Sequence, residues 1–188
     1  WGNGDARRAG PKAATRAAKK AARDSEERGD DGERDEGDEH DGDRDGEHVY
    51  YTTVDDSWRS DKVWRHRIGT TQDQDDLVHH ETDQRFFVGV GRSRSDRFIV
   101  VAAGSKTTSE YRYLDADAPD GELVVFAERR EGVEYSLDHA VLGGEDRFLV
   151  MHNATGPDFE LGTAPIAPTP PEGWASLIPH EPAVRLEN

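Results

Sequence analysis

One five-residue string occurs twice in this chain, and its spacing constrains the fold more than any other feature. The segment 96–100, DRFIV, returns fifty positions later as 146–150, DRFLV. Short runs rich in Val, Tyr, Phe and Ile surround both copies and are separated by polar turns, which is the pattern of β-strands. Four strands that repeat at about fifty residues are typical of a β-propeller blade.

The predicted strands follow the same order in both repeats. The strand before each motif covers Phe86–Val90 and, roughly, Tyr135–Val141, and the third and fourth strands follow it. No segment after residue 48 has a convincing helical period, so this part is predicted to be all-β. The clearest predicted strands are 49–54, 62–68, 85–90, 97–103, 111–116, 123–127, 147–151 and 174–178. The third strands are 111–115 and 159–163, and the fourth are 123–126 and 174–177.

These repeats predict about two and three-quarter four-stranded blades of a β-propeller. Propellers typically close with about 4–8 blades, so the chain is expected to form an arc of a larger ring. The predicted divisions are the end of a blade strand and its turn (1–5), a disordered charged insertion (6–47), the rest of a partial first blade (48–83), a second blade (84–131) and a third blade (132–188).

The N-terminal quarter differs sharply in composition from the rest. Residues 6–23 carry seven basic side chains and no acid, whereas 24–47 carry fourteen acids against three arginines. So few large apolar side chains cannot offset the entropy lost on ordering, and disorder is predicted. Composition leaves open whether the acidity belongs to the whole surface or to this segment.

Composition also excludes several classes of function. The net charge of −16 argues against nucleic acid, because phosphate contacts need clustered Lys and Arg. The absence of cysteine excludes disulfides, thiol catalysis and Cys-ligated zinc. No run reaches the roughly 18 apolar residues of a membrane helix, so no membrane partner is expected. The chain begins at Trp1 and not at Met. The expected location of the protein is the cytoplasm.

Two segments approach hydrolase or nucleotide-binding motifs without completing them. The segment 91–95, GRSRS, lacks the second glycine of the G-x-S-x-G nucleophile elbow and lies between two predicted strands. Ser93 is therefore expected in a hairpin loop. The segment 104–108, GSKTT, lacks the upstream glycine of a phosphate-binding loop and is interpreted as a polar turn.

Metal sites are also incomplete in the sequence. Asp41, Asp43, Asp45 and Gly46 match the start of a calcium loop, but its twelfth position is Thr52, not an acid. The histidines include His79-His80, followed by Glu81, as well as His66 and His139 within predicted strands, and they form no H-E-x-x-H motif. We therefore predict no catalytic, cofactor-binding or metal-binding residue and no cofactor.

Several long strings resemble the propeller domain of the prolyl oligopeptidase family, and within it the oligopeptidase B (protease II) subgroup. They cover about 140 residues from His48 to Asn188 in one collinear order. The strings are 58–70 (WRSDKVWRHRIGT), 83–119 (DQRFFVGVGRSRSDRFIVVAAGSKTTSEYRYLDADAP), 129–140 (RREGVEYSLDHA), 152–161 (HNATGPDFEL) and 174–188 (WASLIPHEPAVRLEN).

This resemblance implies a seven-bladed propeller that caps a C-terminal α/β-hydrolase domain with a Ser-Asp-His triad, admits short peptides and, in oligopeptidase B, cleaves after Arg or Lys. The hydrolase domain has no counterpart here, so no triad residue can be carried over. Residues 6–47 stand where the family has a tight turn. The expected function is substrate gating in a serine-type oligopeptidase, with the hydrolase domain and short peptides as partners. A non-catalytic propeller that serves as an interaction module is the alternative.

Overall fold

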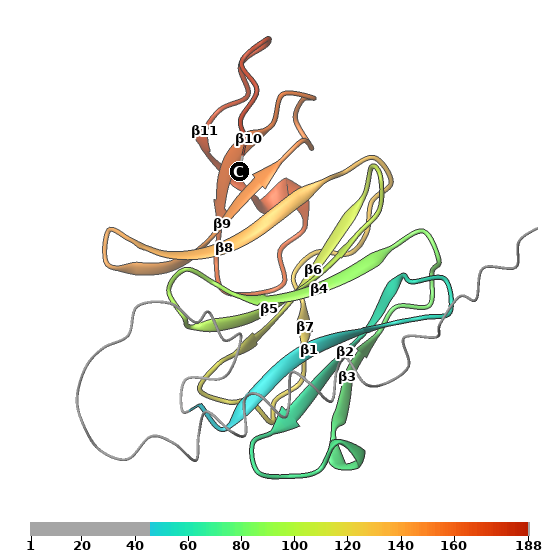
Figure 1. Ribbon diagram of the computed structural model, residues 1–188. Coiled ribbons are helices and arrows are strands. Elements are labelled where there is room, and N and C mark those ends of the chain that lie inside the picture. Colours follow the sequence, from blue (N-terminus) through green and yellow to red (C-terminus); the bar gives the residue numbers. More distant parts are fainter. Residues whose placement is uncertain (1–45, 188) are drawn as a thin grey trace, which may run out of the picture.

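A computed structural model describes residues 46–187 of the chain (Figure 1). Every long element in this range is a β-strand, and only two three-residue 3-10 helices interrupt them. The all-β prediction is therefore confirmed. The predictions made for residues 1–45, including the calcium-loop start at Asp41, Asp43 and Asp45, lie outside the described residues.

The strands form three antiparallel sheets in which sequence neighbours pair with one another. The first sheet contains β1 (His48–Val54), β2 (Ser60–Arg67) and β3 (Asp76–His80), with η1 (Gln72–Gln74) between β2 and β3. The second contains β4 (Phe87–Arg92), β5 (Phe98–Gly104), β6 (Ser109–Asp115) and β7 (Val124–Val125). The third contains β8 (Tyr135–Leu142), β9 (Glu145–His152), β10 (Glu160–Ala164) and β11 (Ala175–Ile178), with η2 (Pro171–Gly173) before β11.

Most predicted strands differ from the observed ones by one or two residues at their ends, and two of these differences have a visible cause. β4 begins at Phe87 and not at Arg85, because the Phe86 N–H donates to the Asp83 carbonyl in a turn. β7 has two residues, whereas 123–127 was predicted. Phe126, the next residue after β7, donates its N–H to the Tyr111 carbonyl. Its own carbonyl accepts a hydrogen bond from the N–H of Thr169 in the β10–β11 connection, so that connection ends the strand.

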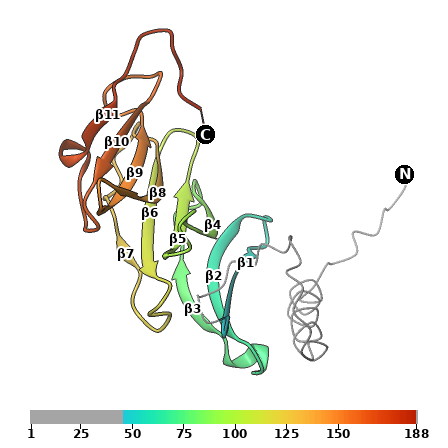
Figure 2. The same ribbon diagram turned by 90° about the vertical axis from the view of Figure 1, so that its left-hand side faces the viewer.

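The sheets pack face to face in sequence order, so that the second lies between the other two (Figures 1 and 2). The first junction, between the first and second sheets, holds a buried aliphatic core that includes Val63, Ile99 and Val101. The second junction, between the second and third sheets, holds an aromatic core around Phe126 and Phe148. Each buried hydrophobic side chain of residues 46–187 therefore belongs to one of two sheet-to-sheet contacts, as in neighbouring propeller blades.

The repeated motif does not repeat in the structure at the spacing of its sequence. Phe98 and Phe148 occupy the same motif position, yet both point into the second junction, where their ring centroids lie 5.3 Å apart. Ile99 occupies the position in the first junction that Phe148 occupies in the second junction. The structural repeat of this strand is therefore 49 residues, because successive side chains of a strand point to opposite faces.

The β4–β5 and β8–β9 connections differ in length, and this difference accommodates the one-residue shift. β8 and β9 are joined by Gly143 and Gly144 alone, both with positive φ (60° and 87°), which is the geometry of a tight two-residue hairpin. β4 and β5 are joined by a longer loop, in which the Ser93 N–H donates to the Phe98 carbonyl.

Candidate functional site

A cluster of charged side chains lies at one rim of the first junction. We call Glu81, Glu110, Arg112 and Arg129 the arginine–glutamate cluster. Glu81 and Glu110 are buried, and Arg129 donates hydrogen bonds to both, at 3.3 Å for Glu110 Oε1. Arg112 Nη1 lies 2.6 Å from the same Glu110 oxygen. The guanidinium of Arg129 also lies over the ring of Phe86, 4.0 Å from its centroid, where a cation–π interaction is favourable.

The surroundings of Glu81 and His79 change how easily each of them ionises. Burial alone raises the pKa of Glu81, but the hydrogen bond and charge of Arg129 outweigh it and hold that pKa below its ordinary value. Burial lowers the pKa of the neighbouring His79, whose Nε2 has no hydrogen-bond partner. These shifts favour the ionised form of Glu81, which pairs with Arg129, and the neutral form of His79.

Arg59 fixes the segment that leads from the first sheet into the second. Its side chain is buried, and Nη1 donates to the carbonyl oxygens of Glu81, Asp83 and Phe86 at 3.0–3.2 Å. Nε donates to the Asp55 carboxylate at 3.0 Å. One guanidinium therefore satisfies three main-chain acceptors that a buried connection would otherwise leave unpaired.

A pocket of about 360 Å³ opens beside the cluster. The predicted polar turn at 105–108 forms one wall, closed by a 2.8 Å hydrogen bond from the Ser105 N–H to the Thr108 carbonyl. This segment joins β5 to β6 as a short hairpin loop and precedes no helix, unlike a phosphate-binding loop. The lining residues are Arg85, Phe86, Ser105, Lys106, Thr107, Thr108, Arg129 and Glu131.

Ser95, His139 and Asp146 form a hydrogen-bonded line across the second junction. His139 Nδ1 lies 2.7 Å from Ser95 Oγ, and Nε2 lies 3.1 Å from Asp146 Oδ1. The composition of a hydrolase triad is present, but not its arrangement. His139 is only 2% exposed between the rings of Phe98 and Phe148, and Asp146 also accepts an ion pair from Arg97 at 2.8 Å. A triad needs a carboxylate dedicated to the histidine and a histidine that reaches the substrate.

The same residues belong to a polar clasp that joins the β4–β5 loop to the β8–β9 hairpin. The clasp consists of Arg94, Ser95, Arg97, Asp138, His139 and Asp146. Arg94 binds Asp138 through its main-chain N–H at 2.9 Å and through Nε at 3.2 Å. Sequence reasoning missed both the clasp and the arginine–glutamate cluster. One hint to the clasp is present in the sequence: Arg97 is the second residue of the first motif copy, and the oppositely charged Asp146 is the first residue of the second copy.

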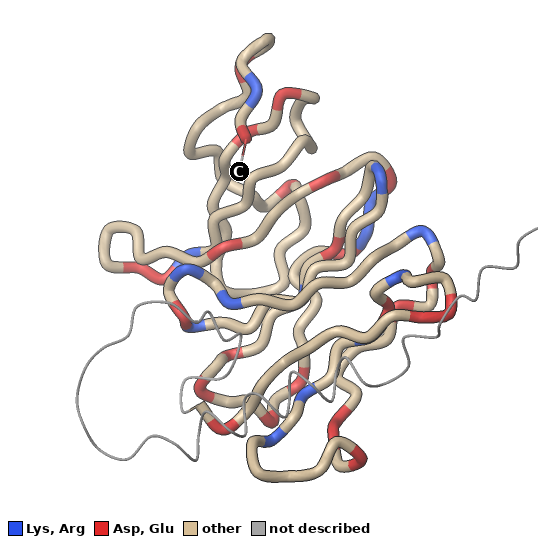
Figure 3. Tube along the Cα trace, in the orientation of Figure 1, with Lys and Arg blue, Asp and Glu red and all other residues tan. Residues whose placement is uncertain are grey.

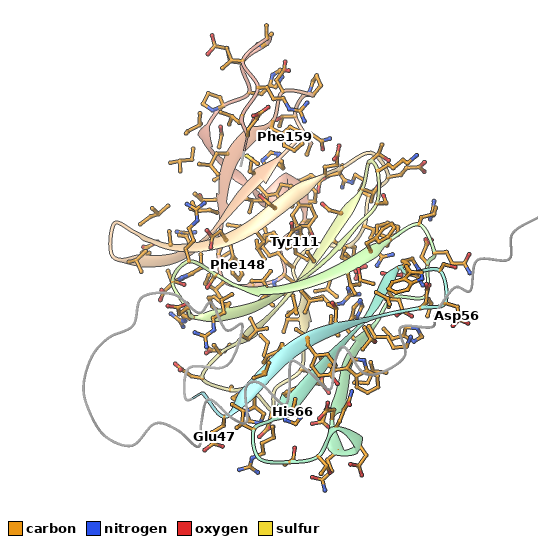
Figure 4. All side chains as sticks on the ribbon, in the orientation of Figure 1. Glu47, Asp56, His66, Tyr111, Phe148 and Phe159 are labelled. Atoms are coloured by element: carbon orange, nitrogen blue, oxygen red, sulfur yellow. The ribbon has the colours of Figure 1, made fainter. Side chains whose placement is uncertain are left out.

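The other residues singled out from the sequence lie apart from one another. Ser93 is buried in the β4–β5 loop, as expected of a hairpin loop. His66, labelled in Figure 4, lies on β2 with Nδ1 2.6 Å from Asp75. Thr52 lies exposed on β1. In residues 46–187 no three metal-ligating side chains come together, and no helix is long and apolar enough to cross a membrane.

The acidity of the chain is not confined to its N-terminal segment. Residues 46–187 hold 26 of the 40 acids and 14 of the 24 basic residues. Figure 3 shows these charges mainly in turns and at strand ends. The described part is therefore strongly acidic by itself, which answers the question that composition left open.

Comparisons with known proteins agree with this architecture. Residues 36–188 match the family described as prolyl oligopeptidase, N-terminal β-propeller domain. Protease 2 of Moraxella lacunata is 37% identical over 121 residues, which cover 64% of this chain and 17% of that protein. Dipeptidyl aminopeptidase BI of Pseudoxanthomonas mexicana is 38% identical over 145 residues, or 76% and 19% of the two chains.

The fold matches solved structures of the same kind. Oligopeptidase B from Trypanosoma brucei superposes with a TM-score of 0.67 at 32% identity, over 76% of this chain and 20% of that one. The chain thus spans about a fifth of the length of the relatives it matches. It belongs to the prolyl oligopeptidase family, and its three sheets are part of that family's N-terminal β-propeller domain.

Proposed function

We propose that this chain is the substrate-gating part of a serine-type oligopeptidase whose catalytic α/β-hydrolase domain lies outside it. The main support for this proposal is the match of residues 36–188 to the N-terminal propeller domain of a peptidase family. The relatives it matches are about five times longer, which leaves ample chain for a hydrolase domain. The proposed role is to admit short peptides and exclude folded proteins, in the cytoplasm.

The ends of the three-sheet arc support a place within a larger ring. On the outer face of the third sheet, Leu142 and Ile178 are 36% and 48% exposed. Blades of a closed propeller cover such residues by packing on the next blade. A further blade on this side would bury them.

Cleavage after Arg or Lys is the proposed specificity, by similarity to oligopeptidase B. The similarity to a protein named dipeptidyl aminopeptidase favours a second candidate, the removal of dipeptides from free N-termini. Two fluorogenic substrates distinguish these candidate activities, one with a blocked N-terminus and one with a free N-terminus. Only the second candidate activity requires the free N-terminus.

The test uses the full-length protein that contains this chain. We expect it to cleave an N-blocked peptidyl-arginyl-coumarin and to react with a fluorophosphonate at a serine outside residues 1–188. Cleavage of a free dipeptidyl-coumarin alone would support the second candidate. A full-length protein without a reactive serine or peptidase activity would overturn the proposal in favour of a non-catalytic interaction module. The 188-residue chain alone should show no turnover.

A further inference from the structure

The first strand of the second sheet has one hydrogen-bonding edge without a partner strand among the described residues. β4 stands at the end of the strand order β4-β5-β6-β7, so among the described residues it pairs only with β5. The Ser93 N–H donates to the Phe98 carbonyl, which makes Phe87, Gly89 and Gly91 the residues whose main chain faces β5. The N–H and C=O groups of Val88 and Val90 therefore point to the free edge.

The side chains of Val88 and Val90 pack into the core of the first junction. This packing holds the strand and its free edge in a fixed position. An edge of this kind is a template for an added strand, and an extended peptide can supply that strand.

Gly89 is the residue of this strip that the fold itself does not explain. Glycine inside a strand weakens it, and it often marks the close approach of a ligand or another backbone. A Cβ built on Gly89 would meet nothing within 4 Å, and its φ is not in the left-handed region. Neither a turn nor an internal contact therefore requires glycine here. The space that a side chain at this position would fill is open to solvent.

Phe87 lies on the same face, two residues before Gly89, and is 55% exposed. The equivalent positions of β8, found from the pairs Val88–Ala103 and Tyr135–His152, are Glu134 and Ser136. An exposed aromatic ring beside an open glycine thus occurs on the first strand of the second sheet and not on that of the third. Arg85 and Phe86, just before Phe87, line the 360 Å³ pocket, which gives an adjoining side chain a place to enter.

We propose that the free edge of β4, from Phe87 to Val90, binds an extended peptide as an added β-strand. Main-chain hydrogen bonds to Val88 and Val90 would hold the peptide, and Phe87 would contact one of its side chains. This proposal rests on the proposed peptide-handling function for its biological ligand. Binding needs no cleavage, however, so it can succeed or fail independently of peptidase activity.

The probe is a fluorescein-labelled octapeptide of alternating Val and Thr, acetylated and amidated at its ends, titrated into the 188-residue chain by fluorescence anisotropy. The same peptide with an N-methyl group on every residue has no N–H donor on either edge, so it cannot form the ladder. We expect the methylated peptide to bind at least about tenfold more weakly. Equal binding of the two peptides would overturn the proposal, and this comparison needs no variant of the protein.

Two variants locate the site. Phe87→Ala removes the exposed ring that would contact the peptide and should weaken binding of the unmodified peptide at least about fivefold. Val141→Ala removes an exposed apolar side chain of β8 and should leave binding within about twofold, with thermal unfolding confirming that both variants fold. Equal loss in both, or loss in neither, would place the site elsewhere. Concentration-dependent dimerisation without peptide that Phe87→Ala abolishes would assign the edge to a second copy and overturn the peptide as its occupant.

Discussion

The two junctions between the sheets are filled in different ways. Six aromatic side chains meet in the second junction, and Phe148 lies at their centre, 4.8 Å from Tyr113 and 5.3 Å from both Phe98 and Phe126. The first junction has two buried aromatic residues, and its centre is aliphatic. Its rim instead carries the arginine–glutamate cluster.

This difference separates two sources of stability. Edge-to-face ring pairs add about 0.5–1.5 kcal/mol each beyond the area they bury, and they are insensitive to salt and pH. Buried carboxylates around one guanidinium are stable only while every charge keeps its partner. We therefore expect the second junction to depend on shape and the first to depend on charge.

The largest expected effect is the loss of the central ring. Phe148→Ala should lower the free energy of unfolding by about 3–5 kcal/mol, because it removes a buried ring and leaves a cavity. Ile99→Ala, at the equivalent place in the first junction, removes fewer carbon atoms and should cost about 2–3 kcal/mol. Urea unfolding followed by tryptophan fluorescence measures both. A larger loss for Ile99→Ala would contradict the comparison.

The second largest effect concerns the charge-dependent junction. Arg129→Met should cost about 2–3 kcal/mol, since it leaves Glu81 and Glu110 buried with less compensation, while its own partial exposure moderates the loss. The control is Arg130→Met. Arg130 pairs with Glu172 at 2.5 Å on the surface, and its loss should cost about 1 kcal/mol or less. Equal losses in the same unfolding assay would show that the cluster adds nothing beyond a surface pair.

The pH dependence of unfolding distinguishes histidines from carboxylates. Burial lowers the pKa of His79 and His152 in the folded chain, so their contribution is complete above the unfolded value of about 6.5 and is lost as the pH falls below it. Although burial raises the pKa of Glu81, its hydrogen bond with Arg129 makes the net shift downward. Its contribution is therefore present above about 4.5 and is lost at lower pH.

Unfolding measured from pH 7.5 to 3.5 should show both stages. His152→Leu should flatten the first stage, because this histidine is buried with neither ring nitrogen hydrogen-bonded. His80→Leu, at a more exposed position, is the control. An unchanged slope between pH 6.5 and 5 in His152→Leu would disprove the assignment.

The smallest effect is expected from the polar clasp. Arg97 and Asp146 are 38% and 44% exposed, so Asp146→Asn should lower the free energy of unfolding much less than Arg129→Met does. A double-mutant cycle with Arg97→Gln isolates the pair, and its coupling should shrink in 0.5 M salt. A coupling above about 2 kcal/mol would make the clasp a main determinant of the second junction.

The strand order and the blade architecture could be predicted from the sequence, because strand runs and turns are local patterns. The register could not. The two motif copies are fifty residues apart in sequence, whereas their strands are equivalent at 49, so Phe98 and Phe148 face each other and do not occupy equivalent places. Only the lengths of the two hairpin turns reveal the shift, and turn length depends on pairing partners that a single sequence does not show.

The candidate site was predictable only in part. Ser93 and residues 105–108 lie in loops, as their flanking strands suggested, whereas Gly104, predicted as part of the turn, ends β5. The arginine–glutamate cluster joins residues up to 48 positions apart. No spacing rule anticipates such contacts, because they arise from the packing of one sheet on another.

The connection between β10 and β11 has a consequence for synthesis of the chain. It returns across the second sheet, where Thr169 donates its N–H to the Phe126 carbonyl and Trp174 stacks on the Phe126 ring with a 7° interplanar angle. A ribosome adds about 5–20 residues per second, so the outer edge of the second sheet stays uncovered for roughly 2–10 s after Phe126 is made. During that interval the nascent chain carries an exposed apolar edge, and slow translation of this stretch would extend its exposure to other chains.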